Sequence, residues 1–222
     1  AIPWNLSDVL RASLIVLVGG IILASFLFPL VSSVGGTAKV AAFLFAVILE
    51  VGLLAMALRY GPRRYGAKLT SVGFRTPRSG TGILPWTVVL ASLMFSFSYL
   101  AFVNMAKLEM LEPNPLPIDR LDTSVHLIGM FVLVVLIAPV AEEVFFRGFM
   151  LPVLVSRRGF ILGACTTSLL FAVTHGTLGL FMPAFVAGML LAWLYYRTGS
   201  VWSCVQAHAT QNCLAYGVAV AF

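Results

Sequence analysis

Six polar residues suited to acid–base chemistry lie inside strongly apolar stretches of the sequence. They are Glu142, Glu143, Arg147, His175, His208 and Asn212. A carboxylate near histidines can activate water, and imidazole or amide groups can stabilise the oxyanion that forms when water attacks a carbonyl. A charge at bilayer depth costs at least about 2.5–3.5 kcal/mol, so polar residues in such stretches indicate a functional site.

Helical spacing separates the roles of the two adjacent carboxylates. Glu143 and Arg147 are four residues apart, so on a helix they share a face and can pair. Glu142 points about 100° away around the same helix and has no such partner there. We therefore expect Glu143 to be neutralised structurally and Glu142 to be left for chemistry.

Two further pairs have the same four-residue spacing. His208 and Asn212 are expected to project together from the last apolar stretch, and Phe171 is expected to place an aromatic wall beside His175. A Glu143–Arg147 pair alone is more typical of helix packing. Two carboxylates, two histidines and an asparagine on three helices favour a site.

Other polar or reactive residues have simpler interpretations. Glu50 is the one polar outlier of its apolar stretch and is interpreted as a packing or cavity-lining residue. His126 stands at a helix entrance and is interpreted as interfacial. Cys165, Cys204 and Cys213 lie in apolar segments without metal-ligand spacing, which indicates packing.

The elements that must position these residues follow from composition. Hydrophobic residues make up 60% of the 222 residues and charged residues 10%, and the mean hydropathy is +1.02. One soluble core cannot bury so much apolar surface, so lipid must be the solvent. The sequence predicts an all-α, polytopic transmembrane bundle of seven to eight helices. Its apolar stretches are Val9–Val31, Val40–Leu58, Ile83–Val103, Val125–Phe146, Phe160–Thr174, Leu178–Tyr196 and Val201–Phe222, with a further short piece at Phe149–Val155.

No linker divides residues 1–222, so one membrane domain is expected, with its first apolar stretch retained as a helix. The net charge of +6 does not indicate nucleic acid, because the positive residues flank apolar stretches and no nucleic-acid motif is present. The positive-inside bias instead places Arg59–Arg78 in the cytoplasm and the acidic, proline-rich Asn104–Ser124 outside. Arg157–Arg158 and Arg197 then also lie inside.

Three sequence motifs carry a family resemblance. EEVFFRG at Glu142–Gly148, FAVTH at Phe171–His175 and HATQN at His208–Asn212 resemble, in order, the motifs of the CAAX prenyl protease and bacteriocin-processing (CPBP, Abi) family. The resemblance covers a core of about residues 125–222. Residues 1–124 contribute additional transmembrane helices and loops.

This resemblance implies an intramembrane endopeptidase. Glu142 and His175 would activate water, while His208 and Asn212 would hold the water or stabilise the oxyanion. Glu143 and Arg147 would form the supporting ion pair. The implied partners are the lipid bilayer and a peptide or protein substrate, including a lipidated or C-terminal tail segment, and the implied location is the prokaryotic plasma membrane.

Metal dependence is left open by these residues. Glu142, His175 and His208 form a one-carboxylate, two-histidine set of the kind that binds catalytic Zn²⁺ in a metalloprotease. The HExxH helix of soluble zinc peptidases is absent, and Asn212 beside His208 suits an oxyanion better than a ligand shell, which favours a metal-free route. The rival functions are a transporter or channel with a proton relay and a non-catalytic membrane scaffold.

Membrane depth adds one structural prediction. Glu142 and His175 reach a common depth if the helix that contains Glu142 continues through Phe149–Ser156 instead of ending at Gly148, and helix tilt or an embedded loop would also close the gap. Pro139 and Pro152 are the expected bending points of this long helix.

Overall fold

The computed structural model describes residues 2–111 and 124–221, and these residues form helices without any strand. Five segments are long and apolar enough to cross a membrane: Leu6–Ser33, Ala38–Tyr65, Leu84–Met105, His126–Thr174 and Leu178–Thr198. The all-helical prediction is confirmed. The acidic loop that is expected outside the membrane contains Glu112, Asp119 and Asp122, and these three residues lie outside the described residues.

The count of seven to eight helices is not confirmed. His126–Thr174 counts once among these five, although the chain reverses at Gly159 within it. The last helix, α8 (Val201–Ala221), is absent from the five because its polar residues, among them His208 and Asn212, lower its hydropathy. These two residues are also ones that the sequence predicts in the active site.

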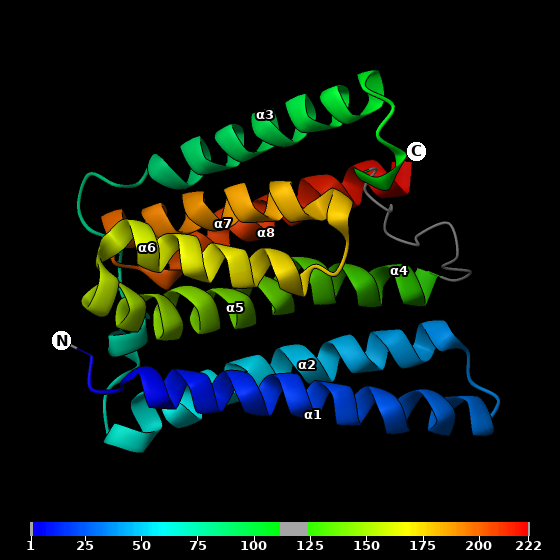
Figure 1. Ribbon diagram of the computed structural model, residues 1–222, viewed down its shortest axis with the longest axis horizontal. Helices are drawn as coiled ribbons and strands as arrows, with labels where there is room; N and C mark the ends of the chain where they lie inside the picture. The colour runs from blue at the N-terminus through cyan, green and yellow to red at the C-terminus, as the bar shows by residue number, and fades with distance from the viewer. Residues whose placement is uncertain (1, 112–123, 222) are drawn as a thin grey trace.

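The helices pack as a layered bundle with the central chain segment in its middle (Figure 1). Helices α1 (Leu6–Ser33) and α2 (Ala38–Tyr60) pair at one edge. Helix α3 (Leu84–Met105) covers the opposite edge, against α7 (Leu178–Thr198) and α8. The central segment lies between them. It consists of α4 (Ser124–Phe131), η5 (Val132–Ile137), α5 (Ala138–Glu143), η6 (Val144–Met150) and α6 (Leu151–Thr174).

The central segment contains two π-helical stretches, η5 and η6, and each ends two residues before a proline, Pro139 or Pro152. Proline lacks an N–H and crowds the preceding turn, and π-helical turns mark helices that absorb such a disturbance. The helix nevertheless continues through residues 149–156, as the depth argument predicts. It reverses at Gly159, whose φ of 74° and ψ of 171° lie outside the helical region.

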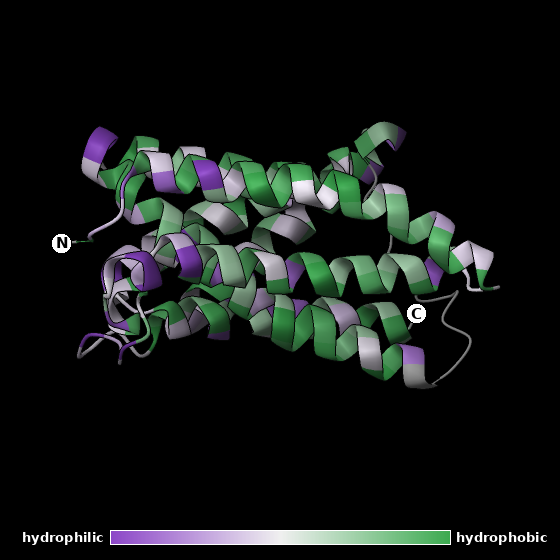
Figure 2. Cartoon of the chain, turned by 90° about the horizontal axis from the view of Figure 1, so that it is seen from below, coloured by the Kyte–Doolittle hydropathy of each residue, from purple (hydrophilic) through white to green (hydrophobic). Residues whose placement is uncertain are grey.

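Three basic segments expected on one membrane side meet at one end of the bundle. Arg75 Nε donates to the Gly199 carbonyl at 2.5 Å, and Arg78 Nη1 donates to the Tyr196 carbonyl at 2.8 Å. Arg157 lines the same cavity as Arg75. Hydrophilic colouring gathers at this end (Figure 2). The shared end agrees with the predicted topology, and the cytoplasmic assignment stays a prediction.

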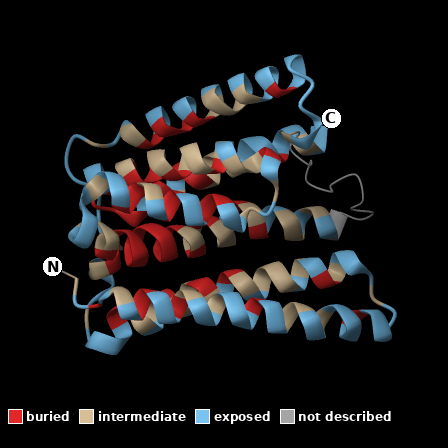
Figure 3. Ribbon diagram, in the orientation of Figure 1, coloured by how far each residue is buried: buried red, intermediate tan, exposed pale blue. Residues whose placement is uncertain are grey.

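Burial is concentrated in the central segment. Residues from Ala141 to Leu151 are all buried except Glu142, which is half-buried (Figure 3). The surface of α1 is by contrast lined with exposed leucines, isoleucines and phenylalanines, such as Leu14, Ile21 and Phe26. In a membrane protein such a face suits lipid, so the polar cluster is held in the part of the bundle that is best shielded from lipid.

Candidate active site

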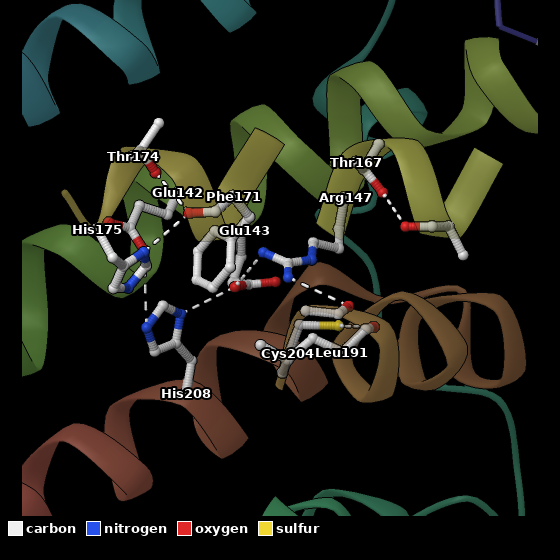
Figure 4. Close-up of polar contacts among 12 residues, drawn as sticks. Glu142, Glu143, Arg147, Thr167, Phe171, Thr174, His175, Leu191, Cys204 and His208 are labelled. Carbon is white, nitrogen blue, oxygen red and sulfur yellow. Dashed lines mark hydrogen bonds and ion pairs between the residues drawn. The ribbon is translucent and has the colours of Figure 1, made fainter. Parts of the chain in front are cut away.

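The centre of the site is Glu143, the last residue of α5, whose side chain is 0% exposed. Its Oε1 accepts a hydrogen bond from Arg147 Nη1 at 2.8 Å and lies 2.9 Å from His208 Nδ1 (Figure 4). The ion pair expected from the four-residue spacing is therefore present. The contact with His208 was not expected, and it connects the central segment directly to α8.

Arg147 is held on its other sides by α7 and by an aromatic ring. Its Nη2 donates to the Gly188 carbonyl at 3.3 Å, and its guanidinium carbon lies 4.5 Å from the centre of the Phe171 ring. A Cβ at Gly188 would stand 2.9 Å from the Cβ of Ser168, so α6 and α7 approach each other at a distance that only glycine allows. The small residue thus brings a backbone carbonyl within reach of the buried cation.

His175 follows directly after α6, and its Nδ1 lies 2.8 Å from the Phe171 carbonyl oxygen. A carbonyl oxygen only accepts, so Nδ1 carries the hydrogen and the neutral ring keeps an acceptor lone pair on Nε2. The Phe171 ring contacts both histidines, with centroid distances of 4.6 Å to His175 and 5.8 Å to His208. Phe171 therefore provides the predicted aromatic wall for both rings.

His208 faces both glutamates. Because Glu143 is paired with Arg147, its carboxylate accepts, so His208 Nδ1 donates and Nε2 is the acceptor of the neutral ring. That Nε2 lies 3.6 Å from Oε2 of Glu142, whose side chain is 16% exposed. Glu142 is thus the more accessible of the two carboxylates and faces the free nitrogen of an oriented histidine.

Asn212 makes a contact that differs from its expected role. Its Nδ2 donates to the Val134 carbonyl at 2.9 Å. Val134 lies in π-helical η5, where a carbonyl pairs with the N–H five residues later. That residue is Pro139, which has no N–H, so the Asn212 amide satisfies an otherwise unpaired carbonyl.

The suggested zinc ligands do not form a metal site in this structure. Within residues 2–111 and 124–221, no group of three or more His, Cys, Asp or Glu side chains is arranged to hold a metal ion. His208 gives Nδ1 to Glu143, and His175 gives Nδ1 to a backbone carbonyl. Although each histidine keeps Nε2, the side chains of Glu142, His175 and His208 are not arranged around one metal position. The mechanism below therefore has no step at a metal.

Two hydrogen-bond acceptors of the site were not predicted from the sequence. Both are backbone carbonyl groups, those of Gly188 and Val134. Pro139 is a usable signal for the second, because a proline inside an apolar helix leaves a carbonyl without its donor. Gly188 gives no comparable signal, since glycine is common at helix contacts in membranes.

Comparison with known proteins supports the resemblance drawn from the motifs. The model of the family described as type II CAAX prenyl endopeptidase Rce1-like matches residues 124–214, which include all three motifs. Searches of curated proteins and of solved structures gave no match. The suspected family resemblance is thus confirmed over this segment.

Proposed function

We propose that this protein is an intramembrane endopeptidase of the CAAX prenyl type, in which Glu142 activates the water that cleaves a peptide bond. The observation that carries the proposal is the contact chain from Arg147 through Glu143 to His208, which ends 3.6 Å from Glu142. It orients a histidine toward a half-buried carboxylate inside a membrane helix bundle.

Glu142 is the base of this mechanism. It takes a proton from the attacking water as the water oxygen bonds to the carbonyl carbon, and it returns that proton to the leaving amine when the C–N bond breaks. Glu143, one residue later, is already engaged by Arg147 and His208. His175 Nε2 accepts a hydrogen bond from the same water, which orients it for attack.

His208 stabilises the charge that develops on the carbonyl oxygen. In its protonated form both ring nitrogens donate, and Nδ1 lies 2.9 Å from the Glu143 carboxylate, which fixes the direction of the ring. Nε2–H is then directed at the oxyanion. A carboxylate hydrogen-bonded to a histidine fixes the orientation of the ring and stabilises its positive charge, and an oriented donor stabilises an oxyanion.

Asn212 acts in this scheme mainly by holding α8 against η5. Its bond to the Val134 carbonyl fixes the register of the helix that presents His208, four residues earlier. The second N–H of the amide remains for the oxyanion. Loss of Asn212 is therefore expected to impair catalysis less than loss of His208.

The substrate class follows from the family. Its description names CAAX prenyl endopeptidases, so a peptide with a prenylated cysteine near its C-terminus is the first substrate to test. A lipid-modified tail partitions into the bilayer, where the carboxylates and histidines are buried.

The test is cleavage of a farnesylated CAAX peptide and of its unmodified counterpart by the purified protein in detergent. Glu142→Gln keeps the shape of the side chain and removes the base, so we expect cleavage to be lost. Glu109→Gln changes an exposed acid in a short 3₁₀ turn and serves as the matched control with wild-type rates. Equal rates in wild type and Glu142→Gln would refute the assignment.

A further inference from the structure

Glu50 is a buried carboxyl group that the proposed mechanism does not use. It lies in α2, outside the segment that matches the family, and is 9% exposed. Its Oε2 is buried and has no hydrogen-bond partner within the described part of the chain. A buried polar atom without a partner costs roughly 1–3 kcal/mol, so simple packing gives no reason to keep a carboxyl group here.

The position of α2 brings Glu50 to the site. Helix α2 packs against α5, which contains the Glu142–Glu143 pair, and against η6, which follows it (Figure 1). Glu50 and Glu142 thus lie on two helices that contact each other, and the charge of one acts on the other through the buried interior. Arg147, the cation of this cluster, hydrogen-bonds to Glu143 at 2.8 Å and not to either of these two carboxyl groups.

Two neighbouring carboxyl groups in a medium of low dielectric constant do not both ionise readily, since like charges repel strongly there. The low-energy arrangement has one carboxylate and one protonated carboxyl. A protonated carboxyl is a hydrogen-bond donor, so a bond to Glu142 would give Glu50 Oε2 the partner that it lacks.

We propose that Glu50 is a positioning residue of the active site, which holds the Glu142 carboxylate in place by donating a hydrogen bond to it. The inference rests on the proposed function and assigns to the N-terminal helix pair a part in the active site. Glu50 touches neither the substrate nor the water. It retains its own proton while Glu142 takes up and releases the proton of the reacting water.

Two substitutions at Glu50 separate positioning from packing. Glu50→Gln keeps the size and a donor N–H, so kcat should stay within about threefold of wild type. Glu50→Met keeps the size but has no donor, so kcat should fall by about 10²-fold, the loss typical of a misplaced catalytic group. KM should be unchanged in both variants, because Glu50 does not contact the substrate.

Thermal unfolding in detergent should rank the two Glu50 variants in the opposite order from kcat, with Glu50→Met the more stable. Replacing the buried Glu50 carboxyl by an apolar group removes the cost of burying it, which one hydrogen bond to Glu142 only partly offsets, so Glu50→Met should melt at or above the wild-type temperature. A packing role predicts that activity and stability change in the same direction. Activity of Glu50→Met equal to or above that of Glu50→Gln would overturn the proposal. Glu109→Met, at an exposed acid, is the matched control and should leave both readouts unchanged.

A double-mutant cycle tests the Glu50–Glu142 pair without any substrate. Glu50→Met and Glu142→Met should shift the unfolding temperature non-additively, because each removes one half of the same interaction. Additive shifts would overturn the pairing even if the protein is a peptidase. If no peptide is cleaved but the shifts are non-additive, the pair stands and the proposed peptidase function fails.

Discussion

Replacing Glu143 by glutamine should destabilise the protein strongly, and the structure allows the size of the effect to be worked out. The carboxylate is fully buried and accepts from two donors, Arg147 Nη1 at 2.8 Å and His208 Nδ1 at 2.9 Å. Glutamine has nearly the same volume, so the substitution changes charge without opening a cavity. Both donors bond Oε1, so the amide oxygen of glutamine can keep both hydrogen bonds, and the amide nitrogen takes the place of Oε2, which has no hydrogen-bond partner among the described residues.

Removing one partner of a buried ion pair costs about 3–5 kcal/mol, because the remaining charge is left uncompensated. Arg147 is only 1% exposed and cannot turn to water. Its remaining partners, the Gly188 carbonyl at 3.3 Å and the Phe171 ring, recover part of the loss. We therefore expect the lower end, about 3 kcal/mol. For a chain of this length that corresponds to a decrease of roughly 6–12 °C in unfolding temperature.

The measurement is thermal unfolding of the purified protein in detergent, followed by tryptophan fluorescence. Glu142→Gln is the matched control, since it makes the same change one residue earlier, where the carboxylate lacks a hydrogen bond from Arg147. Its unfolding temperature should not fall. A Glu143→Gln variant that melts with the wild type, or an equal decrease for Glu142→Gln, would refute the division of roles between the two glutamates.

Further predictions concern the surroundings of the site, its metal content and its topology. Asn212→Leu leaves the Val134 carbonyl unpaired, so stability should fall by about 1–3 kcal/mol and kcat should decrease, as read by unfolding and initial rates. Gly188→Ala places a methyl group 2.9 Å from the Ser168 Cβ and should cost about 1–3 kcal/mol; full stability would contradict the close helix contact. Prolonged treatment with a strong chelator should leave activity unchanged, and stoichiometric zinc by elemental analysis in an active preparation would contradict the metal-free mechanism. A cysteine introduced at Lys68 should react with a membrane-impermeant reagent only from the cytoplasmic side, and labelling from outside would reverse the topology.

The helices could be predicted from the sequence because hydropathy reports directly on the lipid environment. The apolar stretch Leu178–Tyr196 corresponds to α7, and the helix through Glu142 continues past Gly148, as the comparison of membrane depths favoured. The π-helical turns could not be predicted. An α-helix and a π-helix in a membrane both need an apolar sequence, and hydropathy does not report which carbonyl each N–H bonds to.

Contacts between site residues of the same helix could be predicted from the sequence, whereas contacts between different helices could not. The four-residue spacing of Glu143 and Arg147 determines their distance, and the structure has that pair. The contact of Glu143 with His208 depends instead on how α8 is rotated and translated against α5. That placement depends on packing and on single contacts such as Asn212 to Val134, which no spacing along one helix encodes.

The asymmetry between two adjacent residues of the same type argues most strongly for chemistry at Glu142. A bundle that needed only a buried ion pair would keep Glu143 and Arg147 and place an apolar residue before them, since every additional buried carboxylate opposes insertion and folding. Instead Glu142 remains, 16% exposed and 3.6 Å from His208, near a second acid, Glu50, in another helix. Arrangements that lower stability in this way persist where activity requires them. A variant with apolar residues at both Glu50 and Glu142 should therefore be more stable than the wild type and inactive, and a loss of stability would show that these two carboxyl groups serve the fold.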